Sequence, residues 1–279
     1  MESGQNLQRR IRSVKNIGQI TKAMELVAAT KMRKSQELAL GSRPYGYTAL
    51  EILGIISHLN NGVKMPELLK KREVKTTAFV VMTSDKGLAG SFNSAVIRKF
   101  EKYIKENGID VRDSKNVFIA IGQKAKTYLE RRNIRVIESF TSVGDFTKIS
   151  EADAISELLI EGYRSHLFDR VLSFSTVFVT ALKQEVFVHE LLPASFESIK
   201  QSVEELVPQA GRFSQYVRTE TFADTKEKEY LIEPSPSEVL EYLAPELVKI
   251  RIYQMILEAN ASEHSARRVA MKSSCQPPR

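Results

Sequence analysis

The chain has 279 residues, of which 42% are hydrophobic, and it carries a formal net charge of +7 at pH 7, so it can bury a good core in one or two domains. It has no run of eighteen apolar residues and only one cysteine, Cys275, which excludes a membrane-spanning helix and a disulfide framework. The N-terminus lacks the apolar block of a secretory signal.

The N-terminal segment, residues 1–60, is predicted to form one long helix. Its apolar residues recur at steps of three and four and therefore share one helix face. They are Leu7, Ile11, Val14, Ile17, Ile20, Met24 and Val27, surrounded by Arg9, Arg10, Arg12, Lys15, Lys22, Lys31, Arg33 and Lys34. About fifty helical residues at ~1.5 Å each span ~75–80 Å, longer than a compact domain. This narrow seam favours a coiled-coil partner, although two ordinary amphipathic helices on a core would show a similar pattern. The basic residues predict an acidic partner.

The central segment, residues 74–195, has the pattern of an α/β domain. Apolar β-branched runs at 76–83, 117–122 and 135–140 predict strands, and the segments 92–106, 124–132 and 149–168 predict helices. This alternation favours a sheet covered by helices, parallel in its first half. The connection between the strands at 171–180 and 185–192 is too short for a crossover helix, so these strands are expected to pair as an antiparallel hairpin. The polar stretch 196–233 predicts a loop region.

The C-terminal segment, residues 234–273, is predicted to form the second long helix, followed by an irregular tail at 274–279. Ser235, Pro236 and Glu238 form a helix-start pattern. The apolar residues again recur at helical spacing, among them Leu243, Leu247 and Ile250. We therefore expect an α/β fold in which the N- and C-terminal segments form a long antiparallel two-helix coiled coil attached to a central sheet domain.

Catalytic chemistry has little support in the sequence. The four histidines are scattered without metal-binding spacing, and there is no GxxxxGK[ST] loop. The loop Ser84–Ser91 joins a strand to a helix and could cradle a phosphate, but a glycine-assisted turn is the favoured interpretation, with Asp85 as a capping residue. We expect no catalytic residue, no metal and no cofactor.

Four blocks of the chain carry a resemblance to a known family. They are RIRSVKNIGQITKAMELVAATKMRKSQ, TSDKGLAGSFN, YLIEPSP and ASEHSARRVAMK, in this order along nearly the whole sequence. Together they resemble the gamma subunit of the F-type ATP synthase. The resemblance implies a noncatalytic central rotor shaft that couples rotation of the membrane ring to conformational changes in the alpha/beta ring. It also implies contacts with alpha, beta, epsilon and c-ring subunits, at the cytoplasmic face of the bacterial inner membrane.

The resemblance also implies roles for particular residues. Met24 and Arg267 match positions facing an acidic loop of the beta subunit, with Lys22, Lys31 and Arg33 in the same basic collar. Tyr230 and Glu233 match positions near the polar loops of the c-ring. An equal rise along both helices independently predicts that Arg267 lies opposite a residue close to Met24.

The end of the chain departs from the family pattern, because Pro277 and Pro278 stop the helix where relatives continue it. A helix ending near Ser273 would reach about as far as Thr21, which leaves the seam from Leu7 to Ile20 without its coiled-coil partner. A truncated sequence, a frameshift or a divergent rotor would each explain this departure. A defective or repurposed family member is therefore an alternative.

Two other classes of protein fit parts of the sequence. The basic helix is compatible with nucleic-acid binding, but its regular seam and the lack of a recognised binding motif disfavour that class. A small-molecule enzyme using the Ser84–Ser91 loop would not explain two matched terminal helices.

Overall fold

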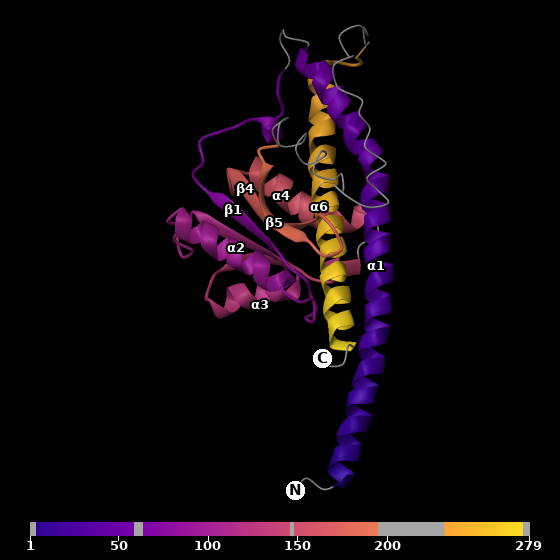
Figure 1. Ribbon diagram of the computed structural model, residues 1–279. Helices are drawn as coiled ribbons and strands as arrows, with labels where there is room; N and C mark the ends of the chain where they lie inside the picture. The colour runs from indigo at the N-terminus through magenta and orange to yellow at the C-terminus, as the bar shows by residue number, and fades with distance from the viewer. Residues whose placement is uncertain (1–3, 59–63, 146–147, 195–231, 276–279) are drawn as a thin grey trace.

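The computed structural model describes residues 4–58, 64–145, 148–194 and 232–275. Two long helices, α1 (Gly4–His58) and α6 (Pro236–Cys275), lie side by side, and a five-stranded sheet packs against one side of α6 (Figure 1). The N-terminal part of α1 extends beyond the end of α6 (Figure 1). The predicted fold class is confirmed.

The sheet consists of β1 (Thr77–Met82), β2 (Asn116–Ile121), β3 (Val136–Phe140), β4 (Arg170–Phe178) and β5 (Gln184–Leu192). Its strand order is β3-β2-β1-β4-β5. The first three pairings are parallel, and β4 and β5 pair antiparallel, as the short connection between them predicts.

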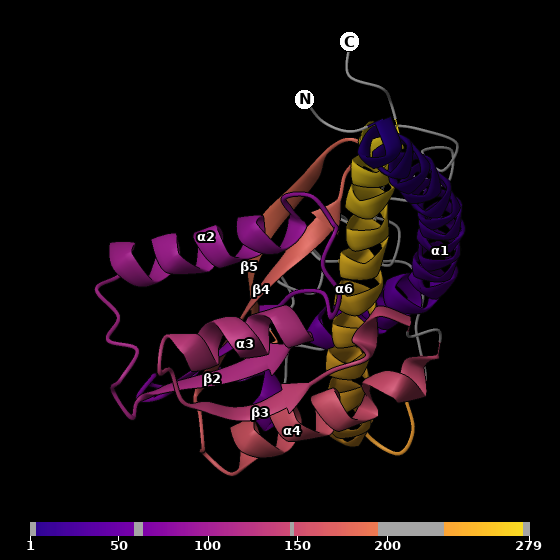
Figure 2. The same ribbon diagram turned by 90° about the horizontal axis from the view of Figure 1, so that it is seen from below.

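The two faces of the sheet are covered by different helices (Figure 2). Helices α2 (Phe92–Glu106) and α3 (Gln123–Arg131) enclose one face, where Phe79, Phe100, Phe118 and Phe174 form an aromatic cluster. Helix α4 (Asp153–Arg164) and α6 cover the other face, over alternate β1 residues such as Val80. Period-2 alternation on β1 therefore divides the apolar side chains between two cores.

The predicted helix at 149–168 is shorter than expected. The chain forms a 3₁₀ turn at η3 (Ile149–Ala152) before α4, and α4 ends at Arg164. The next residues turn back, with the amide of Leu167 donating to the carbonyl of Gly162, so that the Phe168 ring covers Gly162. A Cβ at position 162 would lie 2.3 Å from that ring, and the close approach requires glycine. Two further 3₁₀ turns are η1 (Glu67–Leu69) and η2 (Val143–Asp145).

Two hydrogen bonds between side chains of α1 and α6 report the antiparallel register of these helices. Thr21 Oγ1 lies 2.9 Å from Cys275 Sγ, and Gln254 Nε2 donates to Ser42 Oγ at 3.4 Å. The residue numbers in these pairs both sum to 296, as an equal rise along antiparallel helices requires. Near the start of α6, the amide of Lys64 donates to Ser237 Oγ.

The boundaries of both long helices lie close to the predicted ones. The amide of Glu238 donates to Ser235 Oγ, which supports the predicted helix start. Both helices continue through an internal proline, Pro44 in α1 and Pro245 in α6. Helix α6 runs to Cys275, two residues beyond the predicted end, so the predicted irregular tail begins inside the helix. The predicted loop region 196–233 lies outside the described residues except for 232 and 233.

Candidate functional site

Small and polar side chains form the face of α1 that packs on α6. The buried α1 positions, Glu25, Ala28, Ser35 and Ala39, fit steps of three and four, which is the spacing of a coiled-coil contact face. The half-buried Gly18, Thr21, Met32 and Ser42 continue that spacing, and other half-buried positions such as Met24 and Ala29 flank it. Small residues let the two helices approach closely while α6 supplies bulkier side chains, including the buried Leu247 and Ile250 and the half-buried Leu243.

The predicted contact face is wrong over part of its length. Val27 is 56% exposed, although its neighbour Ala28 is buried, and it lies within the reach of α6. The stripe from Ile17 to Val27 is displaced by one position from the contact face, which is about 100° around a helix. It therefore lies beside α6 instead of against it.

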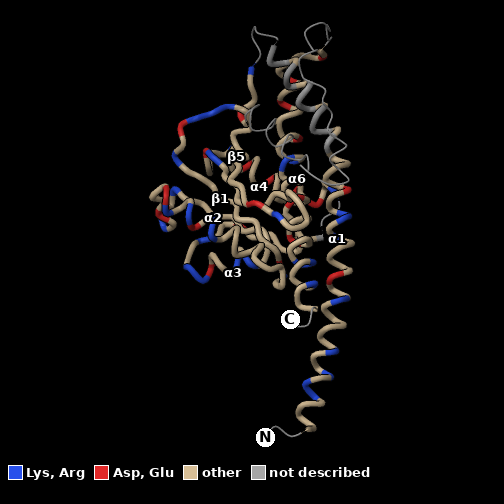
Figure 3. Tube along the Cα trace, viewed as in Figure 1, with Lys and Arg blue, Asp and Glu red and all other residues tan. Residues whose placement is uncertain are grey.

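The N-terminal tip of α1, residues 4–17, combines exposed apolar and basic side chains. Leu7, Ile11 and Val14 continue the contact-face spacing and are 53%, 59% and 69% exposed. Ile17 is 55% exposed. The predicted exposure of this stretch, Leu7 to Ile20, is confirmed. Four basic residues and no acidic residue lie between 4 and 20, and Figure 3 shows this run of positive charge along the tip.

A groove of about 630 Å³ lies between α1, the loop after β1, the loop after β3 and α6. Ile20, Met24 and Val27 form its apolar wall on α1, and Lys31 lies at the same wall. Arg267 lines the opposite side, on α6. The structure thus brings Met24 and Arg267 to one groove, as the equal-rise argument predicts.

Arg267 does not stand out as a solvated charge. Its side chain is 10% exposed, and its Nη1 lies 2.6 Å from Glu263 Oε1. Its Nη2 donates to the carbonyl oxygens of Gly87, at 3.2 Å, and Lys86, at 3.4 Å. The guanidinium therefore points into the molecule, toward the loop after β1.

The other predicted basic contacts lie on α1. Lys22 is exposed and donates to the buried Glu25 at 2.8 Å. The Glu25 pKa is lowered, first by this hydrogen bond and also by the charges of Arg268 and Lys272 on α6, while the Lys22 pKa is raised by the same bond. Arg33 is exposed. These basic side chains form a band around the middle of α1.

The two predicted c-ring positions are separated by the edge of the described region. Glu233 is exposed, just before α6 begins. Tyr230 lies outside the described residues.

The Ser84–Ser91 loop supports α3 by capping it. Asp85 Oδ1 accepts a hydrogen bond from the amide of Gln123 at 3.0 Å, and Thr83 Oγ1 accepts one from the amide of Ala125 at 2.6 Å. These side chains occupy donors that a phosphate would use. Gly122 approaches so closely that a Cβ there would lie 2.1 Å from the carbonyl oxygen of Thr83. Asp85 therefore caps α3 and not α2, the helix that its own loop opens.

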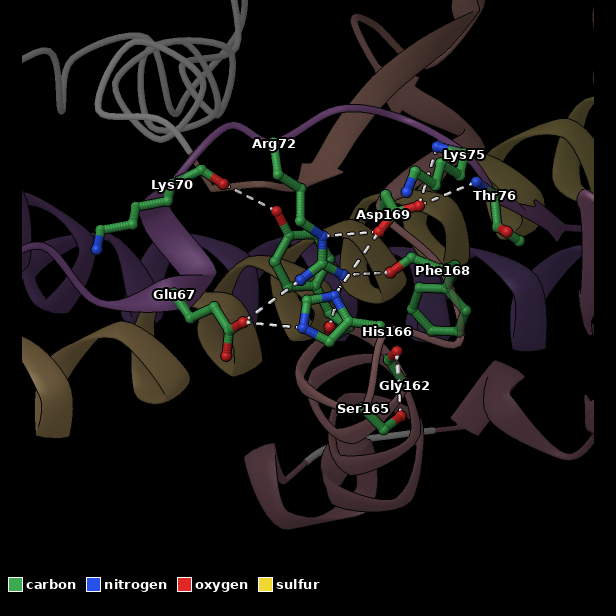
Figure 4. A network of polar contacts seen from close by, with 11 residues as sticks. Glu67, Lys70, Arg72, Lys75, Thr76, Gly162, Ser165, His166, Phe168 and Asp169 are labelled. Carbon is green, nitrogen blue, oxygen red and sulfur yellow. Dashed lines mark hydrogen bonds and ion pairs between the residues drawn. The ribbon is translucent and has the colours of Figure 1, made fainter.

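A buried polar network that the sequence did not reveal ties the segment before β1 to α4 and β4 (Figure 4). Arg72 Nε lies 2.8 Å from Asp169 Oδ1, and Arg72 Nη2 donates to the carbonyls of Tyr163 and Phe168. The guanidinium also lies 4.1 Å from the centre of the Tyr163 ring. Burial alone would raise the Asp169 pKa, but backbone amides of Thr76 and Lys75, together with Arg72, lower it below its ordinary value. The network stabilises this end of the sheet domain. Its partners are separated by about ninety residues in sequence, so no local sequence pattern predicts it.

Within the part of the chain that the structure describes, no three or more His, Cys, Asp or Glu side chains gather in a way that could hold a metal ion. No helix there combines the length and the apolar character needed to cross a bilayer.

Comparisons with known proteins agree with this architecture. The ATP synthase family model matches residues 3–276. The ATP synthase gamma chain of Pelotomaculum thermopropionicum is 35% identical over 97% of this chain and 86% of its own length, and that of Roseiflexus castenholzii is 35% identical over 98% and 86%. The central stalk/c-ring structure of the Tetrahymena thermophila mitochondrial ATP synthase has a TM-score of 0.61 at 22% identity, over 92% of this chain and 100% of the matched one. The chain belongs to the ATP synthase gamma chain family.

Proposed function

We propose that this protein is the central rotor shaft of an ATP synthase and a noncatalytic subunit of that complex. The observation that carries the proposal is the two-helix shaft itself, whose tip presents Leu7, Ile11 and Val14 beside a run of positive charge. Exposed apolar surface with charge around it is typical of a site for protein contact. The family relationship supports an alpha/beta ring as the structure that encloses this tip.

The shape of the shaft supports a mechanism of rotation. The sheet domain lies on one side of α6, so the described chain has no symmetry about the long axis (Figure 1). A rotating asymmetric shaft presents different side chains to each surrounding subunit in turn. The shaft then favours one conformation of a surrounding subunit over another by the difference in its interaction free energy with the two.

Weak contacts suit such a shaft. We propose that Met24, Lys22, Lys31 and Arg33 face beta subunits, because these residues surround the groove or the exposed band of α1. Exposed ion pairs contribute only ~0–1 kcal/mol each, so a basic collar can guide acidic side chains without holding any one of them. Tight pairs would stop rotation.

The opposite end of the molecule is proposed to meet the membrane ring. Glu233 lies just before α6, at the end of the shaft away from the tip, and Tyr230 precedes it in sequence, outside the described residues. In this arrangement the protein is peripheral, held at the cytoplasmic face of a bacterial inner membrane through the epsilon and c-ring subunits. The complex moves protons or sodium ions.

Reconstitution tests the proposal. The chain is mixed with cognate alpha and beta subunits, and the mixture is analysed by size-exclusion chromatography and ATP hydrolysis. We expect a complex that contains one copy of the chain and hydrolyses ATP. Failure of the folded chain to co-elute with alpha and beta subunits that assemble with another gamma chain would overturn the proposal.

A further inference from the structure

We propose that Arg267 is a positioning residue: it shapes the Lys86–Leu88 loop that faces the beta subunit, and it does not itself reach that subunit. This inference rests on the proposed function for the identity of the partner. Its structural core, the hold of Arg267 on the loop, can be measured on the isolated chain.

Both terminal nitrogens of the Arg267 guanidinium are already engaged inside the molecule. Nη1 makes the 2.6 Å ion pair with Glu263 and lies 3.3 Å from His264 Nδ1, and Nη2 donates to the carbonyls of Lys86 and Gly87. With a side chain 10% exposed, the guanidinium could reach an external carboxylate only by giving up these contacts. Its charge is therefore directed at the loop.

The backbone conformation of the Lys86–Leu88 loop depends on contacts from outside the loop. Leu88 has a φ of +62°, in the left-handed region that residues other than glycine, asparagine and aspartate rarely adopt. Such a conformation persists only where the surroundings hold it. The carbonyls of the two preceding residues accept from Arg267, and that of Lys86 also accepts from Ser84 Oγ at 2.6 Å.

These hydrogen bonds place the apolar side chain of Leu88 at the surface. Leu88 is 65% exposed and lines the same groove as Met24 and Val27. Lys86 is exposed beside it. The loop therefore completes a contact surface whose other wall is α1, and Arg267 lies beneath that surface.

The same stretch of α6 holds two other loops in a similar way. Asn260 Nδ2 donates to the carbonyl of Val143 at 3.0 Å, and Ser265 Oγ donates to that of Ala181 at 2.7 Å. His264 Nε2 lies 3.3 Å from the carbonyl of Gly144. These loops follow β3 and β4, so buried polar side chains between 260 and 267 act together on the carboxyl edge of the sheet. Arg267 is the member that acts on the loop after β1.

Substitutions at the ion pair separate charge from positioning. R267K keeps a positive charge but loses the planar fork that reaches a carboxylate and two carbonyls at once. The exchanged pair E263R/R267E keeps an ion pair but turns a carboxylate toward the loop carbonyls. R268Q is the matched control, because it removes a positive charge at the next position, and no hydrogen bond joins Arg268 to the loop among the described contacts.

The first measurement is hydrogen exchange in the isolated chain at the amides of Ser84 and Phe92, which donate to Asn93 Oδ1 and to the carbonyl of Ala89 at the two ends of the loop, with circular dichroism to verify folding. Loss of a hydrogen bond from a charged donor corresponds to about tenfold in a local opening equilibrium. We expect about tenfold faster exchange in R267K and E263R/R267E, and no change in R268Q. Unchanged exchange in both pair variants would overturn the inference, whatever the chain does in a complex.

The second measurement is ATP hydrolysis by the reconstituted complex. If Arg267 acts through the loop, R267K and L88A each lower the rate and the double variant is no worse than the more impaired single variant. Wild-type activity in R267K, with a loss in R267Q, would instead indicate direct charge contact and would refute the inference. If no variant assembles, the wild type included, the proposed function is refuted. The hydrogen-exchange result then tests by itself whether Arg267 positions the loop.

Discussion

The tip of α1 should be dispensable for folding and important for assembly. In the triple variant L7A/I11A/V14A, the apolar side chains are cut back to Cβ. Alanine is a better helix former than any of the three residues that it replaces, so the variant does not weaken the helix through propensity. Because these side chains are more than half exposed, their removal should change the free energy of unfolding of the isolated chain by less than ~0.5 kcal/mol.

Assembly should respond far more strongly. Complete burial of such a side chain contributes ~1.5–3 kcal/mol, and the exposed fractions of 53–69% leave somewhat more than half of that to be gained on enclosure. After allowing for the Cβ that alanine keeps, the three positions together amount to about 2–4 kcal/mol. This corresponds to a complex roughly 30-fold to 1000-fold weaker.

The assay is a titration of alpha and beta subunits with the chain, read by size-exclusion chromatography, alongside urea unfolding of the chain alone. The matched control is Q5A/S13A/N16A, which changes exposed polar positions of the same stretch. We expect the control to behave as wild type in both assays. A tip variant that assembles with unchanged affinity, or that loses more than ~1 kcal/mol of its own stability, would contradict the reasoning.

Three further predictions concern the fold. A28L should cost ~1–3 kcal/mol in urea unfolding because it over-packs the α1–α6 contact, whereas V27L on the exposed stripe should cost less than ~0.5 kcal/mol; equal losses would contradict the assigned contact face. G122A should cost at least ~3 kcal/mol because its Cβ meets a carbonyl oxygen, and G108A, whose φ is also positive (+60° against +89°) but whose Cβ would lie in open space, should cost ~1–2 kcal/mol, so similar losses would count against the clash. Burial, with a smaller contribution from an arginine, lowers the pKa of His189 to about 4, so below its ordinary value of 6.5 the unfolded chain binds more protons and stability falls as pH falls toward 4. In H189Q the loss of stability between pH 7.5 and 4.5 should be smaller by about 2–3 kcal/mol, and an unchanged pH dependence would show that another group is responsible.

The elements of the fold could be predicted because each follows from a local period. Alternation on the strands, helical spacing on the terminal segments and the short connection before Gln184 lead directly to the sheet and the hairpin. The end of α4 could not be predicted, because it depends on Phe168 folding back over Gly162, and that contact is tertiary.

For the candidate site, the position of its residues along the two helices could be predicted, but the direction in which their side chains face could be predicted only in part. Equal rise along two helices brings Met24 and Arg267 to one groove, since rise depends on residue count alone. The choice between two adjacent stripes depends on packing: the bulky stripe through Ile20 is the more hydrophobic, yet the small stripe through Thr21 lets α6 approach. Whether Arg267 faces solvent or a loop depends on carbonyls about 180 residues earlier in sequence.

The paired register of α1 and α6 also sets an angular phase. Each residue turns a helix by about 100°, so one residue inserted into both helices between the sheet domain and the tip would rotate the tip's apolar stripe by about a quarter turn relative to that domain. Seven residues inserted into both would restore the orientation to within about 20° while lengthening the shaft by about 10 Å. Insertions of seven or eleven residues into both helices therefore keep the orientation of the tip to within about 20°, whereas most other lengths turn it away from the sheet domain.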